Sequence, residues 1–407
     1  MNIGQRIKAE RMRKRLTQEA LAGNQLSRSL ISQVERGHCQ PSVKTLAAIA
    51  DALGLPVESL AGNQRVQGDR KLVDRLLTLS RFSKALPATR RAEILTEALH
   101  LSRSLGDSGL IARVLEAIGD LRYDERQYPD ALADYQEAAS EYEGKRRKGR
   151  NVAARLELKT GHCYFDQSLF TNALSHYERA AAAGIQDSAL MVKVTRNLGN
   201  TCCRLGRFSE AVNHFQESQR LAESLSDATA SAHAELGLSY AIRRLGDAAT
   251  ALEKARGSEA LYIAENNDLG VANSRHNMGV AALDLGRLEE AKTWLDQALV
   301  FYQGRNLNDL AGAVHEELAR YWVLRQDLGA AETECRSGLE LVKDTAPAVT
   351  SLRLEAMLAT VERSAGNPAG DKRLRAAAQG LLDIGQGYEL LPMLDNLLQE
   401  AQGVRRR

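Results

Sequence analysis

The chain has 407 residues, of which 44% are hydrophobic and 26% charged, and its formal net charge is +2. A chain of this length exceeds what one hydrophobic core usually supports, while seven prolines and 5% aromatic residues argue against an all-β protein. No apolar run approaches the length of a membrane span and the first residues carry no signal-peptide pattern, so we expect a helical, cytoplasmic protein with no membrane partner.

The charge is distributed unevenly along the chain. Residues 1–62 carry nine Lys and Arg against five Asp and Glu, a net of +4, whereas residues 63–407 carry 45 against 47. A basic excess in the first part favours a polyanionic partner there. The five cysteines, at positions 39, 163, 202, 203 and 335, form no Cys-x-x-Cys pair, so we expect neither a disulfide framework nor a metal site.

The first 62 residues predict a domain of five short helices. Apolar spacing, caps and breakers place these helices at residues 3–14, 17–22, 28–36, 43–53 and 56–60. Thr17, Ser27 and Ser42 are the predicted N-caps, because their side chains can accept a hydrogen bond from a free N–H of the first turn. Two short helices joined by a tight turn, here the second and third, are the plan of a helix-turn-helix domain.

Three segments of this region carry a family resemblance. LTQEALA, LSRSLISQVERG and PSVKTLAAIADALGLPVESL stand in the order typical of the Cro and phage-repressor (XRE) family, which residues 1–62 resemble. In that family the third helix enters the major groove of double-stranded DNA. The resemblance implies that Arg28, Ser29 and Gln33 read base edges, since Arg can grip guanine and Gln adenine through two hydrogen bonds each.

Other residues complete the DNA-facing set that the resemblance implies. Side chains at helix N-termini and along the backbone path contact phosphates and so set the register of the protein on the duplex. The flanking and phosphate-contacting residues expected here are Thr17, Gln18, Ser27, Ser32 and Lys44. The alternative is that any one of these side chains is solvated surface and makes no contact with DNA.

Residues 63–69 lack apolar periodicity and are interpreted as a polar linker, and residues 70–407 repeat one pattern. An apolar residue is followed by a small one, and alanine comes twelve positions after the small residue. An aromatic or apolar residue follows four positions after that alanine, and another small residue three positions later. The small residue falls at Gly119, Gly161, Gly199, Gly279 and Ala319, with a looser copy at Gly237 that is two residues out of phase with Ala251.

The pattern resembles the tetratricopeptide repeat, although its copies lie 38 to 42 residues apart, farther than the standard period of about 34. Residues 70–107 and 345–400 are interpreted as atypical terminal helix pairs. The predicted class is therefore all-α: a five-helix DNA-binding domain at 1–62, a linker at 63–69 and a right-handed superhelix of tetratricopeptide-like helix pairs at 70–407.

The inner face of such an array is lined by the first helix of each pair, and it is the expected peptide-binding surface. Asn amides can donate to and accept from a peptide backbone, while Lys and Arg can bind carboxylates. Counting from the small residue of each repeat, the predicted lining comprises Arg155, His162, Lys193, Arg196, Asn200, Arg204, Asn273, His276 and Arg320. Glu116, Asp120, Asp124, Asp284 and Glu316 lie beside them, and simple solvation of these polar side chains is the alternative.

A helix-turn-helix domain followed by such repeats looks like the peptide-pheromone-sensing regulators of the Rgg, PlcR and NprR type. That resemblance implies a homodimeric transcriptional regulator whose array binds a regulatory peptide or protein and modulates the grip on a DNA operator. The alternative is a protein that acts mainly by sequestering a partner protein through its repeats. An enzyme is not expected, and no cofactor, because the sequence has no phosphate-binding glycine loop and no metal-ligand spacing.

Overall fold

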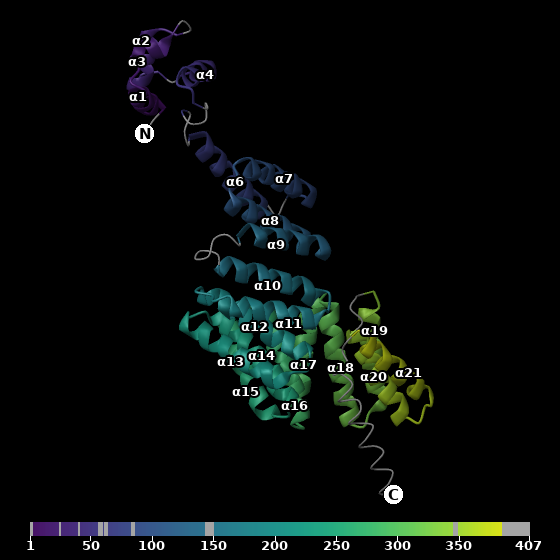
Figure 1. The fold of residues 1–407 in the computed structure, drawn as a ribbon. Helices are drawn as coiled ribbons and strands as arrows, with labels where there is room; N and C mark the ends of the chain where they lie inside the picture. The colour runs from purple at the N-terminus through teal and green to yellow at the C-terminus, as the bar shows by residue number, and fades with distance from the viewer. Residues whose placement is uncertain are drawn as a thin grey trace. The chain divides into compact units, whose positions relative to one another are not determined.

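The computed structural model describes residues 3–23, 26–39, 41–55, 60, 64–82, 86–142, 150–344 and 349–384. Within these ranges all regular structure is helical and no residue lies in a β-strand, which confirms the predicted all-α class (Figure 1). The backbone contacts divide the chain into two units, Met1–Gly144 and Lys145–Arg407. This division lies within the repeat array and not at the linker predicted from the sequence.

The first unit begins with four short helices. They are α1 (Ile3–Arg13), α2 (Gln18–Ala22), α3 (Arg28–Arg36) and α4 (Val43–Ala52). Thr17, Ser27 and Ser42 accept hydrogen bonds from the backbone N–H three residues later, as predicted for N-caps. The apolar sides of the helices meet in one core, formed mainly by Ile7, Leu21, Ile31, Val34, Ile49 and Leu53. Most of the predicted fifth helix, residues 56–59, lies outside the described residues.

Two antiparallel helix pairs follow in the same unit. Their helices are α6 (Gln64–Phe82), α7 (Ala88–Ser104), α8 (Ser108–Asp124) and α9 (Tyr128–Tyr142). Because α6 begins at Gln64, all but the first residue of the predicted linker 63–69 is helical. Polar composition alone does not break a helix, and these residues include no proline.

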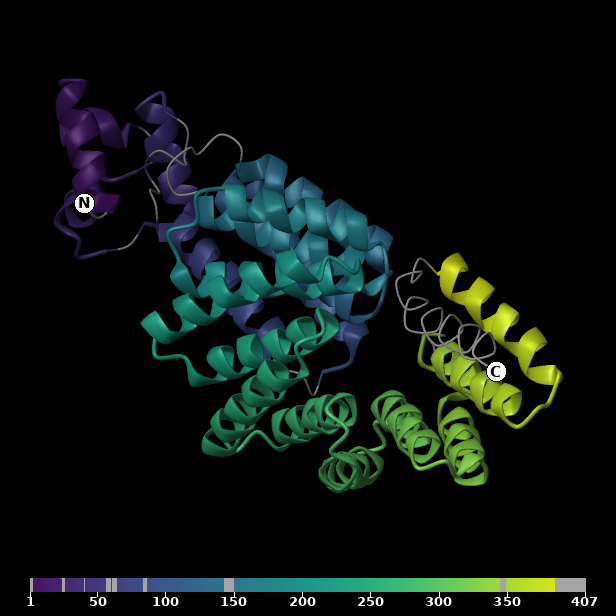
Figure 2. The ribbon, with the colours of Figure 1, turned by 90° about the horizontal axis from the view of Figure 1, so that it is seen from below.

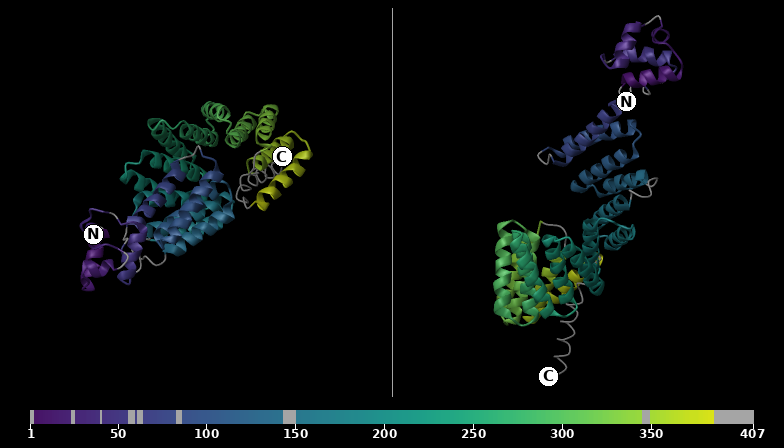
Figure 3. Two further views of the ribbon diagram at one scale, coloured as in Figure 1. Left: turned by 90° about the horizontal axis from the view of Figure 1, so that it is seen from above. Right: turned by 90° about the vertical axis from the view of Figure 1, so that its left-hand side faces the viewer.

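The second unit consists of six helix pairs that follow one curve (Figure 2). Figure 3 shows the same ribbon from two further directions. The first helices of the pairs are α10 (Arg150–Asp166), α12 (Ser188–Arg204), α14 (Ala228–Arg244), α16 (Asp268–Asp284), α18 (Asn308–Leu324) and α20 (Val349–Ser364). The second helices are α11 (Phe170–Ala182), α13 (Phe208–Ser224), α15 (Ala248–Ala264), α17 (Leu288–Gly304), α19 (Leu328–Val342) and α21 (Ala369–Asp383).

Helix length explains the long repeat period. In the most regular part, α12 to α18, every helix has 17 residues and is separated from the next by three. The middle residue of these turns has a positive φ, as at Ser226, Gly246 and Asn266. The first helices are capped by Asp187, Asp227 and Asn267 in turn. Two such helices with their turns give 40 residues, which accounts for the spacing seen in the sequence.

The small residue of each repeat lies at the twelfth position of its first helix, and where it is a glycine it faces a large side chain of the second helix. A Cβ atom on Gly161, for example, would lie 2.3 Å from the Tyr177 ring. In α14 the twelfth position is Ser239, which is buried, and not Gly237. The predicted two-residue phase slip is therefore wrong: Ser239 precedes Ala251 by the usual twelve residues, and the turn between α14 and α15 is regular. Among the described helices, none is both long and apolar enough to cross a bilayer.

Candidate functional site

Helix α3 presents a polar face next to its buried one. Ile31 and Val34 are fully buried in the core, while Arg28, Ser29 and Gln33 are exposed. Positions 28, 29, 32 and 33 follow the i, i+1, i+4, i+5 spacing of one helix face, so these side chains lie on one side of α3. The three predicted base-reading residues are thus placed together on an accessible surface, with half-buried Ser32 at its edge.

Glu35, on the same helix, holds α3 against α1 and α2. Its carboxylate accepts hydrogen bonds from Nε of Arg11 at 2.7 Å, from Nη2 of Arg11 at 3.0 Å and from Nε2 of Gln18 at 2.7 Å. Arg11 also donates to the carbonyl oxygen of Leu16 at 2.7 Å. Burial alone would raise the pKa of Glu35, but the hydrogen bonds from Arg11 and Gln18 outweigh it and the pKa is lowered.

The remaining predicted DNA-facing residues differ in their exposure and in the hydrogen bonds they make within the protein. Thr17 and Ser27 are exposed but use their oxygens as helix caps. Gln18 is half-buried, and its amide donates to Glu35 within the protein. The side chain of Lys44 lies outside the described residues. The contacts of these residues with DNA stay predictions.

The second unit contains a cavity of about 670 Å³ that is open to solvent. Side chains of six first helices, α10, α12, α14, α16, α18 and α20, converge on it, together with Phe215 of α13 and Tyr302 of α17. A volume of this size is within the usual range for ligand pockets, which is about 300–1,000 Å³. The cavity is therefore the candidate binding site of the array.

Five of the nine residues predicted as peptide-binding line this cavity: Arg196, Asn200, Arg204, Asn273 and His276. The other four do not line it. Arg155 is half-buried on α10 and Lys193 is exposed on α12. His162 is 2.8 Å from the amide nitrogen of Asn197, and Arg320 is paired with Asp284. For all nine residues, contact with a peptide stays a prediction.

Several residues that line the cavity were not predicted from the sequence. His233 and Tyr240 are on α14, and they occupy the same repeat positions as the predicted residues once Ser239 is taken as the small residue. Buried Ser239, following Leu238 and preceding Ala251 by twelve, was the signal that could have identified them. Asn197 and Asn277 also line the cavity, and each directly follows a predicted residue, Arg196 or His276. Arg353 lines the cavity from α20.

Apart from its arginines, the cavity is lined by groups that are neutral near pH 7. Burial lowers the pKa of His276 to about 4 and also lowers that of His233, although Thr229 accepts a hydrogen bond from the latter ring. Burial raises the pKa of the Cys203 thiol to about 12, and burial also raises the pKa of the Tyr302 hydroxyl, so both groups are neutral. Tyr302 donates to the amide oxygen of Asn273 at 2.8 Å.

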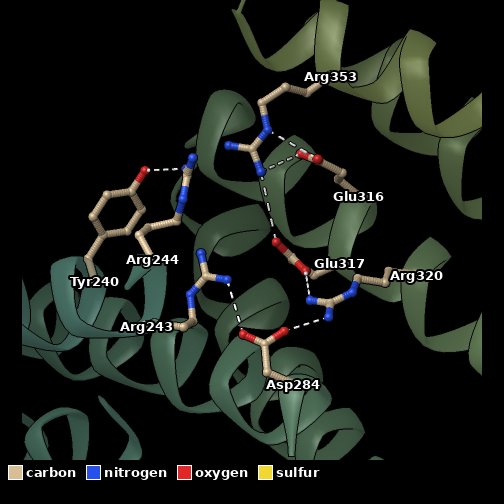
Figure 4. A network of polar contacts seen from close by, with 8 residues as sticks. All are labelled: Tyr240, Arg243, Arg244, Asp284, Glu316, Glu317, Arg320 and Arg353. Atoms are coloured by element: carbon tan, nitrogen blue, oxygen red, sulfur yellow. Dashed lines mark hydrogen bonds and ion pairs between the residues drawn. The ribbon is translucent and has the colours of Figure 1, made fainter. Parts of the chain in front are cut away.

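A chain of alternating charges runs from the cavity across four successive first helices (Figure 4). Arg353 of α20 binds Glu316 and lies 3.8 Å from Glu317. Glu317 lies 3.6 Å from Arg320, which also binds Asp284 of α16. Asp284 lies 3.3 Å from Arg243 of α14. We call these six residues the charge ladder; three arginines balance three carboxylates in it.

The described residues contain no group of three or more His, Cys, Asp or Glu side chains that could hold a metal ion. Among the described residues, the exposed face of α3 and the polar cavity of the second unit are the candidate sites that contain the predicted binding residues.

Comparison with known families identifies both parts of the chain. A helix-turn-helix domain family matches residues 2–61. Two tetratricopeptide repeat families match the array, one at residues 152–224 and 189–257 and the other at 271–303. The chain thus carries a helix-turn-helix domain followed by tetratricopeptide repeats.

Individual relatives also match either the helix-turn-helix domain or the repeat array. An immunity repressor protein of Bacillus phage phi105 is 46% identical over 65 residues, which are 16% of this chain and 45% of the repressor's length. The solved structure of the apo form of RapI is similar with a TM-score of 0.57 at 12% identity, covering 77% of this chain and 86% of that one. NprR in complex with its cognate peptide NprX is similar with a TM-score of 0.55 at 11% identity, covering 70% and 84%. At these identities the two structures show that the fold is shared.

Proposed function

We propose that this chain is a sequence-specific transcriptional regulator that binds an operator as a homodimer and whose repeat cavity binds a regulatory peptide. The observation that carries the proposal is the exposed set of Arg28, Ser29 and Gln33 on one face of a capped helix. Its domain resembles a phage immunity repressor. Arg and Gln are the side chains that read guanine and adenine by two hydrogen bonds.

The chemistry of the cavity supports a peptide as the ligand. Asn200 makes no hydrogen bond to another described residue, and the amide nitrogen of Asn273 is not used in its bond to Tyr302. An asparagine amide can donate to and accept from one peptide unit at the same time. Peptide binding would shift the population between array conformations and so change the affinity for DNA.

The DNA-reading half is tested with the double variant Arg28→Ala, Gln33→Ala in a gel-shift titration on the DNA upstream of the protein's own gene. Loss of two base contacts should cost about 2–6 kcal/mol of specific binding, since each two-bond contact discriminates by about 1–3 kcal/mol. Binding to unrelated DNA, which phosphate contacts dominate, should change little when the salt concentration is held constant.

The control is Arg36→Ala, which removes an exposed arginine from the end of α3 outside the predicted base-reading set. Circular dichroism should show equal helix content in all variants. Unchanged specific binding by the double variant would contradict the assignment of Arg28 and Gln33. No specific shift by the wild type at any salt concentration would favour the alternative function, sequestration of a partner protein.

A further inference from the structure

The cavity of the second unit carries an excess of positive charge. Three arginines line it, Arg196, Arg204 and Arg353, and no aspartate or glutamate does. Its two histidines, His233 and His276, are kept neutral by burial and add no charge near pH 7. The ligand of such a site is expected to bring negative charge, provided that the arginines are not already neutralised by the protein.

Arg353 is neutralised by the protein. Its Nε donates to Glu316 at 3.1 Å, its Nη2 lies 3.0 Å from the same carboxylate, and Glu317 lies close by (Figure 4). The charge ladder therefore accounts for this arginine. Binding a ligand carboxylate there would require breaking contacts that the folded protein already makes.

Arg196 and Arg204, both on α12, differ from Arg353 in that the described residues do not neutralise their charges. Neither has a carboxylate within ion-pair distance among the described residues, although both are half-buried and burial lowers the pKa of Arg196. Tyr262 and Asp227 act on Arg196 only through longer-range electrostatic interactions, and the Asp227 carboxylate caps α14 by accepting a hydrogen bond from Ala230 N–H. The Arg204 guanidinium lies 5.3 Å from the centre of the Phe170 ring, and its Nε is buried without a hydrogen-bond partner.

These two arginines and Asn200 lie in line on α12. The positions 196, 200 and 204 are successive i, i+4 neighbours on one helix face, and the outer two are about 12 Å apart along the axis. A half-buried charge with no carboxylate beside it is partly desolvated, so a ligand carboxylate that pairs with it gains more than it would at a fully exposed site. An extended peptide advances about 3.3 Å per residue and covers that separation in about four residues.

We propose that the ligand of this cavity is an acidic peptide with two carboxylates about three or four residues apart, one bound by Arg196 and the other by Arg204. Asn200 binds the peptide backbone between them. This inference rests on the proposed peptide-binding function and adds the chemical class of the ligand. The carboxylates are those of Asp, Glu or the peptide C-terminus.

The test uses the full chain and an equimolar pool of randomised heptapeptides. Peptides that stay bound after gel filtration are sequenced by mass spectrometry. The wild type should retain peptides enriched in acidic residues. Arg196→Gln and Arg204→Gln should each lose the enrichment at one position and bind the best wild-type peptide roughly tenfold more weakly, the effect of one lost charge-assisted hydrogen-bonded pair.

Two controls separate charge at the site from charge in general. Arg375→Gln removes an exposed positive charge from α21, whose residues do not line the cavity, and should leave the selection unchanged. Arg196→Lys keeps the charge and should recover most of the enrichment. Because Arg196 pairs with no carboxylate among the described residues, Arg196→Gln should melt at or above the wild-type temperature. A markedly lower melting temperature would mean that the arginine is structural.

The outcomes distinguish the two proposals. Retained peptides with no acidic enrichment, or enrichment that both Gln variants preserve, would overturn the acidic ligand while leaving peptide binding intact. If the wild type retains no peptide at all, the proposed peptide-binding function fails and the acidic ligand with it.

Discussion

One carboxylate, that of Glu35, connects three helices of the DNA-binding domain. It binds Arg11 of α1 by two hydrogen bonds and Gln18 of α2 by one, while its own helix carries the exposed Arg28 and Gln33. The side chain of Arg11 is only 13% exposed and that of Glu35 only 3%. The orientation of the predicted recognition helix therefore depends on a buried ion pair that includes none of the residues predicted to read bases.

We expect Glu35→Gln to destabilise this domain by about 2–3 kcal/mol, because it leaves the Arg11 charge buried without its partner. Hydrogen exchange of the α1 and α3 amides measures this locally. Since the pKa of Glu35 is lowered in the folded state, its contribution should be complete above the unfolded value near 4.5 and lost as the pH falls through the folded value. The difference between variant and wild type should thus shrink in acid.

The matched control is Glu10→Gln, which breaks the exposed pair of Glu10 with Arg13 on α1. Exposed pairs of this kind contribute about 0–1 kcal/mol, so little change is expected. Equal effects of the two variants would show that burying the Glu35 pair does not increase its contribution to the stability of the domain.

Within each helix pair, a small residue of the first helix lets the second helix approach. Gly161 of α10 faces Tyr177 of α11, which is 1% exposed. The twelve-residue and four-residue spacings seen in the sequence place these two residues opposite each other. The helix boundaries and the contact between the small and the large residue depend on residues close together in the chain. The repeat pattern could therefore predict them.

Gly161→Ala should lower the stability of the array by about 1–3 kcal/mol, because its Cβ would lie 2.3 Å from a Tyr177 ring that cannot move aside. Thermal unfolding measures the loss. Gly304→Ala, at the end of α17 with no atom within 4 Å of the added Cβ, should be neutral or slightly stabilising. Equal melting temperatures for the two variants would contradict close packing at Gly161.

At the scale of the whole molecule, the charge ladder ties successive repeats of the second unit together. Asp284 of α16 holds both Arg320 of α18 and Arg243 of α14. Asp284→Asn leaves these two arginines facing each other without the carboxylate between them. The free energy of unfolding should fall by about 1–2 kcal/mol.

Glu289→Gln is the comparison for the ladder, because it breaks an isolated pair with Arg325 whose side chains are 78% and 50% exposed. It should cost less than about 0.5 kcal/mol. Urea unfolding of both variants gives the two changes in the free energy of unfolding. Equal changes would show that the ion pairs of the charge ladder stabilise the fold no more than an isolated surface pair does.

The sequence by itself determined the helical class, the helix-turn-helix, the caps at Thr17, Ser27 and Ser42 and the spacing of the repeats. These features follow from periodicity and from side chains that interact within a few residues. It also placed Arg28, Ser29 and Gln33 on an exposed face, since the opposite face of that helix is apolar.

Only the tertiary structure decided which polar residues of the array meet. Arg196 and Arg353 are far apart in the chain, and they line one cavity because a small rotation between successive pairs accumulates into a curve. The structure also pairs Arg320 and Arg353 with carboxylates, whereas Arg196 has none among the described residues. Periodicity specifies the face on which a charged side chain lies, but its partner depends on the neighbouring helices that the curve brings within reach.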